Sequence, residues 1–134
     1  MNDALPFLAT EGFDALVGLT ITELGDDLVR GEVPVRDDLK QPYGLVHGGV
    51  FAAIAESLAS LATAVAVAAE GRQAMGQSNQ TNFLRPIVAG TIHGTARARQ
   101  RGRTSWVWDV EITDDEGRLC ALTRMTVAVR ARSN

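Results

Sequence analysis

A single acidic residue interrupts a long apolar stretch in the middle of this chain. Between Lys40 and Glu70 the only formally charged side chain is Glu56, which lies among Ala, Leu, Val and Ile. A carboxylate in apolar surroundings costs roughly several kcal/mol unless it is paired or its pKa rises. Glu56 is therefore a candidate for chemistry. The alternative is a structural ion pair with a distant Arg, across the core or across a subunit interface.

A His-Gly-Gly turn provides the second candidate group. His47, Gly48 and Gly49 precede a helix predicted over residues 50–69, whose first N–H groups lack partners and lie at the positive end of the helix dipole. Such amides can bind an anion or an oxyanion. The alternative for both glycines is steric, because a sharp turn before a helix favours glycine. His47 in such a turn is more often a hydrogen-bonding residue than a base.

Glu56 and the glycine turn are too far apart for a direct contact within one chain. Seven or eight residues of helix correspond to about two turns and roughly 11 Å of rise. A second subunit could bring the two groups face to face across a cleft. A carbonyl polarised at the Gly48 N–H, next to a carboxylate, indicates acyl transfer. A thiolate, with a pKa of about 8.5, leaves without a strong general acid, so a thioester fits these few groups.

The elements that would position these groups are one long helix and about six antiparallel strands. The pattern predicts a short helix over residues 5–16, a hairpin of residues 17–24 and 28–36, and strands over 73–86, 90–101, 104–113 and 118–130. The long helix is apolar almost all round, with Glu56, Ser60 and Thr63 on one stripe. We therefore predict a single α+β domain over residues 1–134, its curved sheet wrapped around a helix with no solvated face.

Composition and charge exclude several classes of protein. The helix is long enough to span a membrane, but Glu56 and the lack of flanking basic clusters favour a buried core helix. The net charge of −3 argues against a nucleic-acid-binding protein. The N-terminus lacks a basic region and a long apolar run, so we expect no signal peptide and a cytoplasmic protein. One cysteine, Cys120, allows no internal disulfide and no zinc cluster, and it is expected in the core.

Basic residues gather in the last third of the chain. Residues 85–134 contain nine Arg and five acidic side chains, and residues 1–84 contain four basic and 11 acidic ones. Arg97, Arg99 and Arg101 alternate along one predicted strand and should share its outer face with His93. This run, with Arg103, is by default a solvated sheet face. Its functional alternative is a phosphate clamp for a nucleotide-bearing thioester such as coenzyme A.

Several motifs together resemble a known family. The run QPYGLVHGG from Gln41 to Gly49, followed by Glu56 and Ser60, resembles the hot-dog-fold acyl-CoA thioesterases of the phenylacetate-degradation type. The resemblance is strongest to the branch of 4-hydroxybenzoyl-CoA and 1,4-dihydroxy-2-naphthoyl-CoA thioesterases. It extends over roughly residues 20–130, through GQSN at 76–79, FLRP at 83–86, WVWDV at 106–110 and GRLC at 117–120.

The resemblance implies a role for each matching residue. Glu56 would be the nucleophile or general base, and the Gly48 N–H would polarise the thioester carbonyl. Gln41 and His47 would position that carbonyl, and Ser60 would orient the attacking water. Contacts to the nucleotide part of coenzyme A would come from Arg85, Arg103, Thr104 and Ser105.

The resemblance also implies an assembly and a substrate class. Family members form dimers with active sites at the interface, usually doubled to tetramers, which would bring Glu56 to the Gly48 turn of a partner. Coenzyme A would be part of the substrate, with no separate cofactor and no metal. An aromatic, hydroxyaryl acyl group fits Gln41 and Glu56, since phenylacetate members tend to have Asn and Asp there. The alternatives are a non-catalytic acyl-CoA-binding domain and a hot-dog dehydratase.

Overall fold

The alternating apolar strands form one antiparallel sheet in the computed structural model, which describes residues 7–8 and 11–132. The strands follow the order β1-β2-β3-β5-β6-β7-β4, so that β4 forms one edge. The strands are β1 (Phe7–Leu8), β2 (Thr20–Leu24), β3 (Leu28–Pro34), β4 (Arg72–Phe83), β5 (Thr91–Arg101), β6 (Ser105–Thr113) and β7 (Leu119–Ala131). The helices are α1 (Gly12–Val17), the 3-10 turn η1 (Asp37–Leu39) and α2 (Gly48–Ala68).

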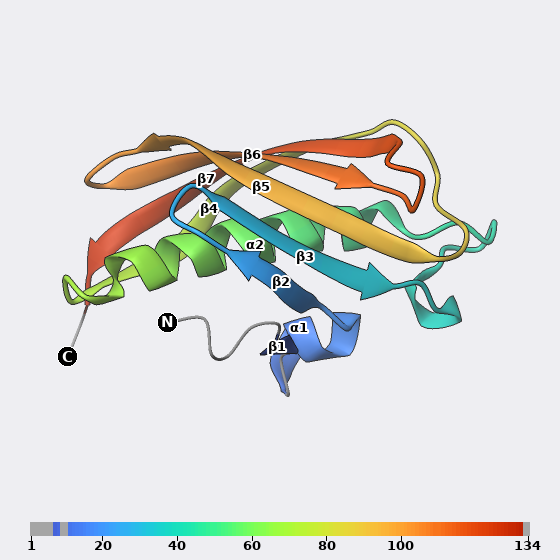
Figure 1. Ribbon diagram of the computed structural model, residues 1–134, viewed down its shortest axis with the longest axis horizontal. Coiled ribbons are helices and arrows are strands. Elements are labelled where there is room, and N and C mark those ends of the chain that lie inside the picture. The colour runs from blue at the N-terminus through green and yellow to red at the C-terminus, as the bar shows by residue number, and fades with distance from the viewer. Residues whose placement is uncertain (1–6, 9–10, 133–134) are drawn as a thin grey trace.

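The long helix α2 lies along one side of the curved sheet, as Figure 1 shows. Its core-facing residues, such as Ile54 and Leu58, pack against the inner faces of the strands. Two glycines permit this close approach: a Cβ at Gly31 or Gly94 would lie 2.9 or 2.8 Å from the Leu58 methyl groups. The predicted α+β hot-dog fold, a curved antiparallel sheet around one central helix, is therefore confirmed.

The prediction that the long helix has no solvated face is wrong, because one side of α2 is exposed in the single chain. Glu56, Val65 and Ala68 are exposed, since the sheet ends at β4 and covers only part of the helix. Within the residues described, α2 is the one helix long and apolar enough to cross a membrane, and half of its apolar window is buried in the fold. The buried half agrees with the prediction that this segment is a core helix.

The N-terminal prediction is wrong in part. The helix expected over residues 5–16 begins at Gly12 and continues to Val17, and Phe7–Leu8 pairs as a strand with β2. Residues 5, 6, 9 and 10 lie outside the described residues. The first hairpin is confirmed as β2 and β3, and α2 begins two residues before its predicted start at Val50.

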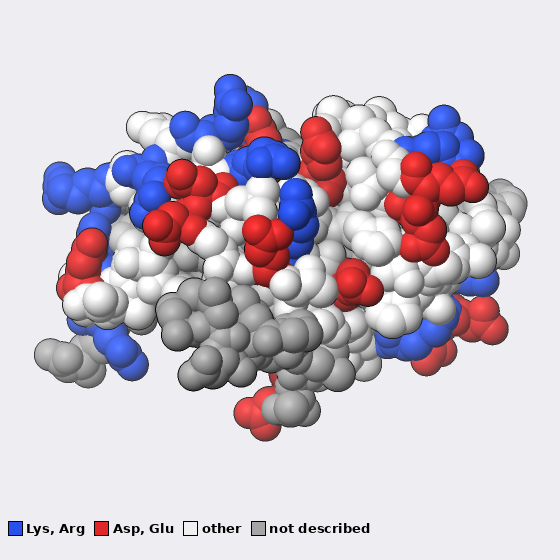
Figure 2. All heavy atoms as spheres, viewed as in Figure 1, with Lys and Arg blue, Asp and Glu red and all other residues white. Residues whose placement is uncertain are grey.

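A β-bulge in β5 changes the predicted arrangement of arginines. Arg97 pairs with Asp109, but the register shifts between Ala98 and Gln100, and Arg101 pairs with Trp106. Because the extra residue reverses the alternation, Arg101 lies on the face of the inward Trp106, 4.6 Å above its ring centroid. The prediction that Arg101 shares the outer face is therefore wrong. Figure 2 shows basic and acidic side chains interspersed over the viewed face.

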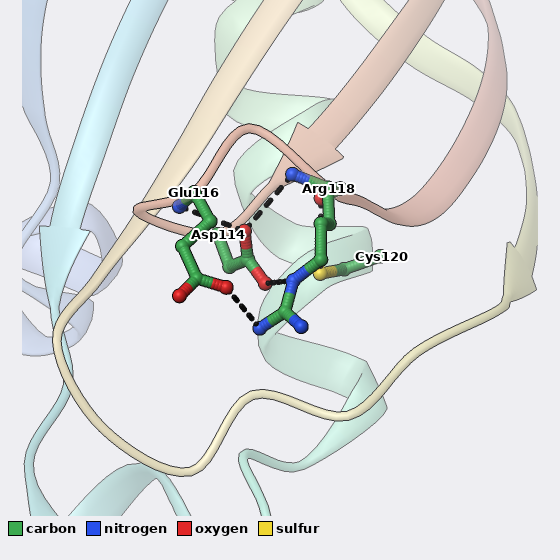
Figure 3. A network of polar contacts seen from close by, with 4 residues as sticks. All are labelled: Asp114, Glu116, Arg118 and Cys120. Atoms are coloured by element: carbon green, nitrogen blue, oxygen red, sulfur yellow. Dashed lines mark hydrogen bonds and ion pairs between the residues drawn. The ribbon is translucent and has the colours of Figure 1, made fainter.

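The turn between β6 and β7 is built around one carboxylate (Figure 3). Asp114 accepts hydrogen bonds from the backbone N–H groups of Glu116 and Arg118, at 3.0 and 2.9 Å, and pairs with Arg118 Nε at 2.8 Å. These bonds hold the pKa of Asp114 below its ordinary value. Cys120, at the start of β7, is buried, and burial raises the pKa of its thiol. A buried neutral thiol fits the predicted core role.

Candidate active site

A cavity of about 500 Å³ opens at the N-terminal end of α2. It brings together four of the residues predicted for the site: Gln41, His47, Gly48 and Arg85. The remaining lining is mostly apolar and comes from the loop before α2, from α2 itself and from the end of β4. These residues are Leu45, Val46, Gly49, Phe51, Phe83, Leu84 and Pro86.

His47 is the N-cap of α2. Its Nδ1 accepts a hydrogen bond of 2.8 Å from the Gly49 N–H, and its carbonyl oxygen accepts one of 2.9 Å from the Val50 N–H. Within residues 11–132, none of the hydrogen bonds at this helix end is donated by the Gly48 N–H. Because Nδ1 is an acceptor here, the neutral imidazole carries its proton on Nε2. The structural role expected for His47 is confirmed, and the Gly48 amide remains available to the cavity.

The two glycines have a steric role, but its cause is not the predicted turn, because neither Gly48 nor Gly49 has a positive φ. A Cβ at Gly48 would lie 2.7 Å from Phe83 Cε1, and one at Gly49 would lie 2.9 Å from His47 Nδ1. Real Cβ atoms essentially never approach so closely, so the Phe83 ring and the imidazole cap both depend on glycine. The His47 cap occupies the N–H groups of Gly49 and Val50, which leaves the Gly48 N–H as the candidate donor to a ligand.

Gln41 is held by the loop that it begins. Its side-chain oxygen accepts a hydrogen bond from the Tyr43 N–H, and its backbone carbonyl accepts one of 2.9 Å from the Gly44 N–H. With that oxygen occupied, the group that Gln41 can offer to a ligand is its NH₂, a donor. A donor at the cavity wall suits a carbonyl oxygen.

Glu56 and Ser60 do not line this cavity. Glu56 is exposed, so the prediction that its carboxylate lies in an apolar surrounding is wrong for the single chain. Its carboxylate lies over β4, where a Cβ at Gly76 would be 3.0 Å from Oε2. Ser60, one turn later, is half-buried, and Thr63 is fully buried and accepts a hydrogen bond of 2.9 Å from Trp108 Nε1.

The residues predicted to contact coenzyme A lie at opposite ends of α2. Arg85 lines the cavity at the N-terminal end, and Arg103 lines another, of about 490 Å³, beside Arg72 and Arg101 at the C-terminal end. The exposed Thr104 and half-buried Ser105 follow Arg103 in the chain. A helix of 21 residues is about 30 Å long, so one chain does not unite these residues.

Two residues of β4 beside Glu56 were not identified as site residues from the sequence. Gly76 lies under its carboxylate, and Asn79 Nδ2 donates a hydrogen bond of 2.9 Å to the Ala52 carbonyl oxygen, one helical turn before Glu56. Both belong to the GQSN motif quoted for the family resemblance. The motif was the only available signal, because a strand-to-helix contact over 27 residues leaves no periodic pattern.

Comparison with known proteins gives the same fold and a family. The family model of the thioesterase superfamily matches residues 43–121. Rv1847 of Mycobacterium tuberculosis, a proposed esterase, is 43% identical over 118 residues, 87% of this chain and 84% of that protein. Its solved structure superposes with a TM-score of 0.85, covering 90% of this chain and 98% of that one.

Two further relatives carry thioesterase names. The proofreading thioesterase EntH of Cronobacter sakazakii is 34% identical over 113 residues, 84% of this chain and 82% of that protein. A Staphylococcus aureus thioesterase, solved as a Gln-to-Ala variant, is 31% identical with a TM-score of 0.81 and covers 84% of this chain and 93% of that one. Escherichia coli PaaI, from the phenylacetic acid degradation operon, shares the fold at 24% identity.

The family model covers more than half of the chain, and the relatives span most of its length. The Gly48 residue at the start of α2, beside a mostly apolar cavity, agrees with that match. The chain therefore belongs to the thioesterase superfamily and is a thioester hydrolase.

Proposed function

We propose that this chain hydrolyses an acyl-CoA thioester with an aromatic acyl group, in a site shared by two copies. The observation that carries the proposal is the separation within one chain of two groups that must act together. Gly48 lines the cavity, whereas Glu56 is exposed about 12 Å further along α2. Each chain thus holds two halves of a site that face different ways.

The free edge of β4 provides a way to join the halves. Phe83 packs on Gly48, and Gly76 lies under Glu56, seven residues earlier on the same strand. Antiparallel pairing of two β4 edges about a two-fold axis at residue 80 would bring Gly76 of a second copy close to Phe83, because the bulge between Gly76 and Ser78 adds one residue to each strand. Glu56 of that copy would then face the cavity beside Gly48. The sequence resemblance extends such a dimer to a tetramer.

The chemistry follows from the groups gathered in this arrangement. The Gly48 N–H would bind the thioester oxygen, as its charge grows in the transition state. The Gln41 NH₂ would donate to the same oxygen. Glu56 would either take a proton from water, which adds to the acyl carbon, or attack that carbon itself to form an anhydride that water later opens. In both routes the carbon–sulfur bond breaks and coenzyme A leaves as a thiolate.

Two observations support the substrate class and the roles of Gln41 and Glu56. Phe51 and Phe83 line the cavity and would flank a planar acyl group. The Staphylococcus aureus thioesterase has been solved with a Gln and with a Glu replaced by Ala, at positions 15 residues apart. Gln41 and Glu56 have the same separation in this chain.

Release of free thiol from a panel of aromatic and straight-chain acyl-CoAs tests the activity. We expect turnover of hydroxyaryl-CoA substrates, and a fall in kcat of about 10³-fold or more for Glu56→Ala. Full activity of Glu56→Ala would show that the mechanism is wrong. Binding of acyl-CoA without turnover by the wild-type chain would instead favour the non-catalytic acyl-CoA-binding alternative.

Mixing two inactive variants tests the shared site. Gly48→Pro removes the amide proton, and proline is tolerated at the first position of a helix. A mixture of Glu56→Ala and Gly48→Pro chains, unfolded and refolded together, should recover about a quarter of wild-type activity, since half of the random dimers hold one intact site. No recovery in a mixture shown by mass to contain mixed dimers would place both groups in one chain.

A further inference from the structure

Asn79 on β4 contacts α2 in the helical turn that ends at Glu56. Its Nδ2 donates a hydrogen bond of 2.9 Å to the Ala52 carbonyl oxygen, at a half-buried position. In an α-helix the carbonyl of residue i−4 accepts the N–H of residue i, so the Ala52 carbonyl is also the acceptor for the Glu56 amide. A side chain of the edge strand and the backbone of Glu56 therefore share one acceptor.

Two threonines hold the Asn79 amide in a single orientation. Thr81 Oγ1 lies 2.7 Å from Asn79 Oδ1 and 2.8 Å from the Oγ1 of Thr123, a buried residue of β7. Because a carbonyl oxygen can only accept, Asn79 must direct its NH₂ to Ala52 and its oxygen to Thr81. Thr81 then donates to Asn79 and accepts from Thr123. The chain of three hydrogen bonds links the sheet interior to the helix turn that carries Glu56.

The same strand supports the carboxylate itself. Gly76 lies against Glu56 Oε2, and a β-bulge between Gly76 and Ser78 separates this contact from Asn79. The backbone hydrogen bonds of β4 to the sheet are made to β7, along the edge of β4 that faces the rest of the sheet. The Asn79 bond therefore fixes the distance between the edge strand and α2 at the level of Glu56.

We propose that Asn79 is a positioning residue for Glu56. Its hydrogen bond to the Ala52 carbonyl holds the α2 turn that carries Glu56 against β4, so that the carboxylate meets the acyl carbon or its attacking water in the correct place. This inference rests on the proposed thioesterase function. Small displacements matter because a shift of about 1 Å can cost roughly 100-fold in rate.

Two substitutions and a matched control test the role. Asn79→Asp keeps the shape but cannot donate to Ala52, and Asn79→Ala removes the group. We expect each to lower kcat about 10-fold or more with KM changed less than about twofold. Thr63→Val also removes a hydrogen bond between α2 and the sheet, seven residues beyond Glu56 on the buried side. It should lower the Tm and leave kcat unchanged.

A double substitution separates positioning from general stability. In a Glu56→Ala background, Asn79→Ala should cause no further fall in the residual kcat, because the group that it positions is gone. An equal fall in both backgrounds, or a kcat within about twofold of wild type for Asn79→Asp, would overturn the inference.

If the Asn79 variants fail to fold or change their oligomeric state, Thr81→Val provides a second test of the inference. It frees the Asn79 amide without altering the residue that contacts α2, and a fall in kcat of about threefold or more is expected. An unchanged kcat in this variant counts against the inference. Wild-type turnover abolished by Glu56→Ala, together with unaffected Asn79 variants, overturns this inference alone. Absence of wild-type turnover overturns the proposed function and this inference with it.

Discussion

The Glu56 carboxylate lies on the backbone of Gly76, at the strand that forms the open edge of the sheet. A Cβ at Gly76 would lie 3.0 Å from Glu56 Oε2 and 3.3 Å from its Cδ. Glu56 is exposed, so its carboxylate is confined by β4 on one side and faces solvent on the other. The absence of a side chain at residue 76 therefore sets how close the carboxylate comes to the edge of β4.

Gly76→Ala should displace the carboxylate without unfolding the protein. The added methyl group forces Glu56 to move by a few tenths of an ångström, and its exposed side chain has room to do so. We expect kcat for the best acyl-CoA to fall about tenfold, with an unchanged KM. Gly25→Ala, in the β2–β3 turn, is the matched control, since its Cβ would make an ordinary contact at 3.4 Å. Equal kcat values for the two variants would contradict the prediction.

Gly48→Ala and Gly48→Pro separate the steric role of this residue from its amide. Both introduce a Cβ that must push the Phe83 ring aside, because a Cβ at residue 48 would lie 2.7 Å from Phe83 Cε1. Only Pro removes the N–H, and the extended backbone of His47 is compatible with a following proline. We expect kcat of the Pro variant to be about 100-fold or more below that of the Ala variant. Similar kcat values would show that the amide is not the oxyanion donor.

Thr63→Val should destabilise the fold because it leaves the buried Trp108 Nε1–H without its partner. Thr63 Oγ1 accepts from Trp108 at 2.9 Å and donates to the Ala59 carbonyl oxygen at 2.8 Å. Loss of a buried partner costs about 1–3 kcal/mol, a fall in Tm of roughly 3–12 °C at this chain length. Thr63→Ser keeps the hydroxyl and should lose less. Thermal unfolding at one fixed protein concentration compares the variants, and equal Tm values would contradict the expectation.

Asp114 should contribute stability that is lost in acid. Hydrogen bonds from the Arg118 backbone and then its side chain, with one from Glu116, hold the folded-state pKa of Asp114 below the ordinary 3.8. A lowered pKa means a contribution that is complete above the unfolded-state value and is lost as the pH falls through the folded-state value. Asp114→Asn should therefore be less stable than wild type at pH 7, and the difference should shrink below about pH 4. Urea unfolding at several pH values measures it, and a constant difference would contradict the prediction.

The family match and the cavity account for part of the site predicted from sequence. Gln41, His47 and Gly48 were predicted together and lie together, because they belong to one loop and the start of one helix, and Arg85, predicted as a coenzyme A contact, lines the same cavity. Arg103 was predicted with Arg85 and lies at the other end of α2. Arg85 of one chain and Arg103 of another would have to meet across a contact between chains. Residue spacing within one chain contains no information on a distance between chains.

The sequence alone determined the long helix, the strands β2 to β7 and the residues that are candidates for chemistry. Alternation of apolar residues defined the strands, and Glu56 and the His-Gly-Gly turn were conspicuous against an apolar helix. The tertiary structure decided that α2 keeps one side exposed, that a bulge turns Arg101 onto Trp106, that Gly76 lies under Glu56, and that Asn79 binds the Ala52 carbonyl oxygen one turn before it. Local periodicity fixes which face a side chain occupies, but contacts between distant segments depend on how the whole chain packs.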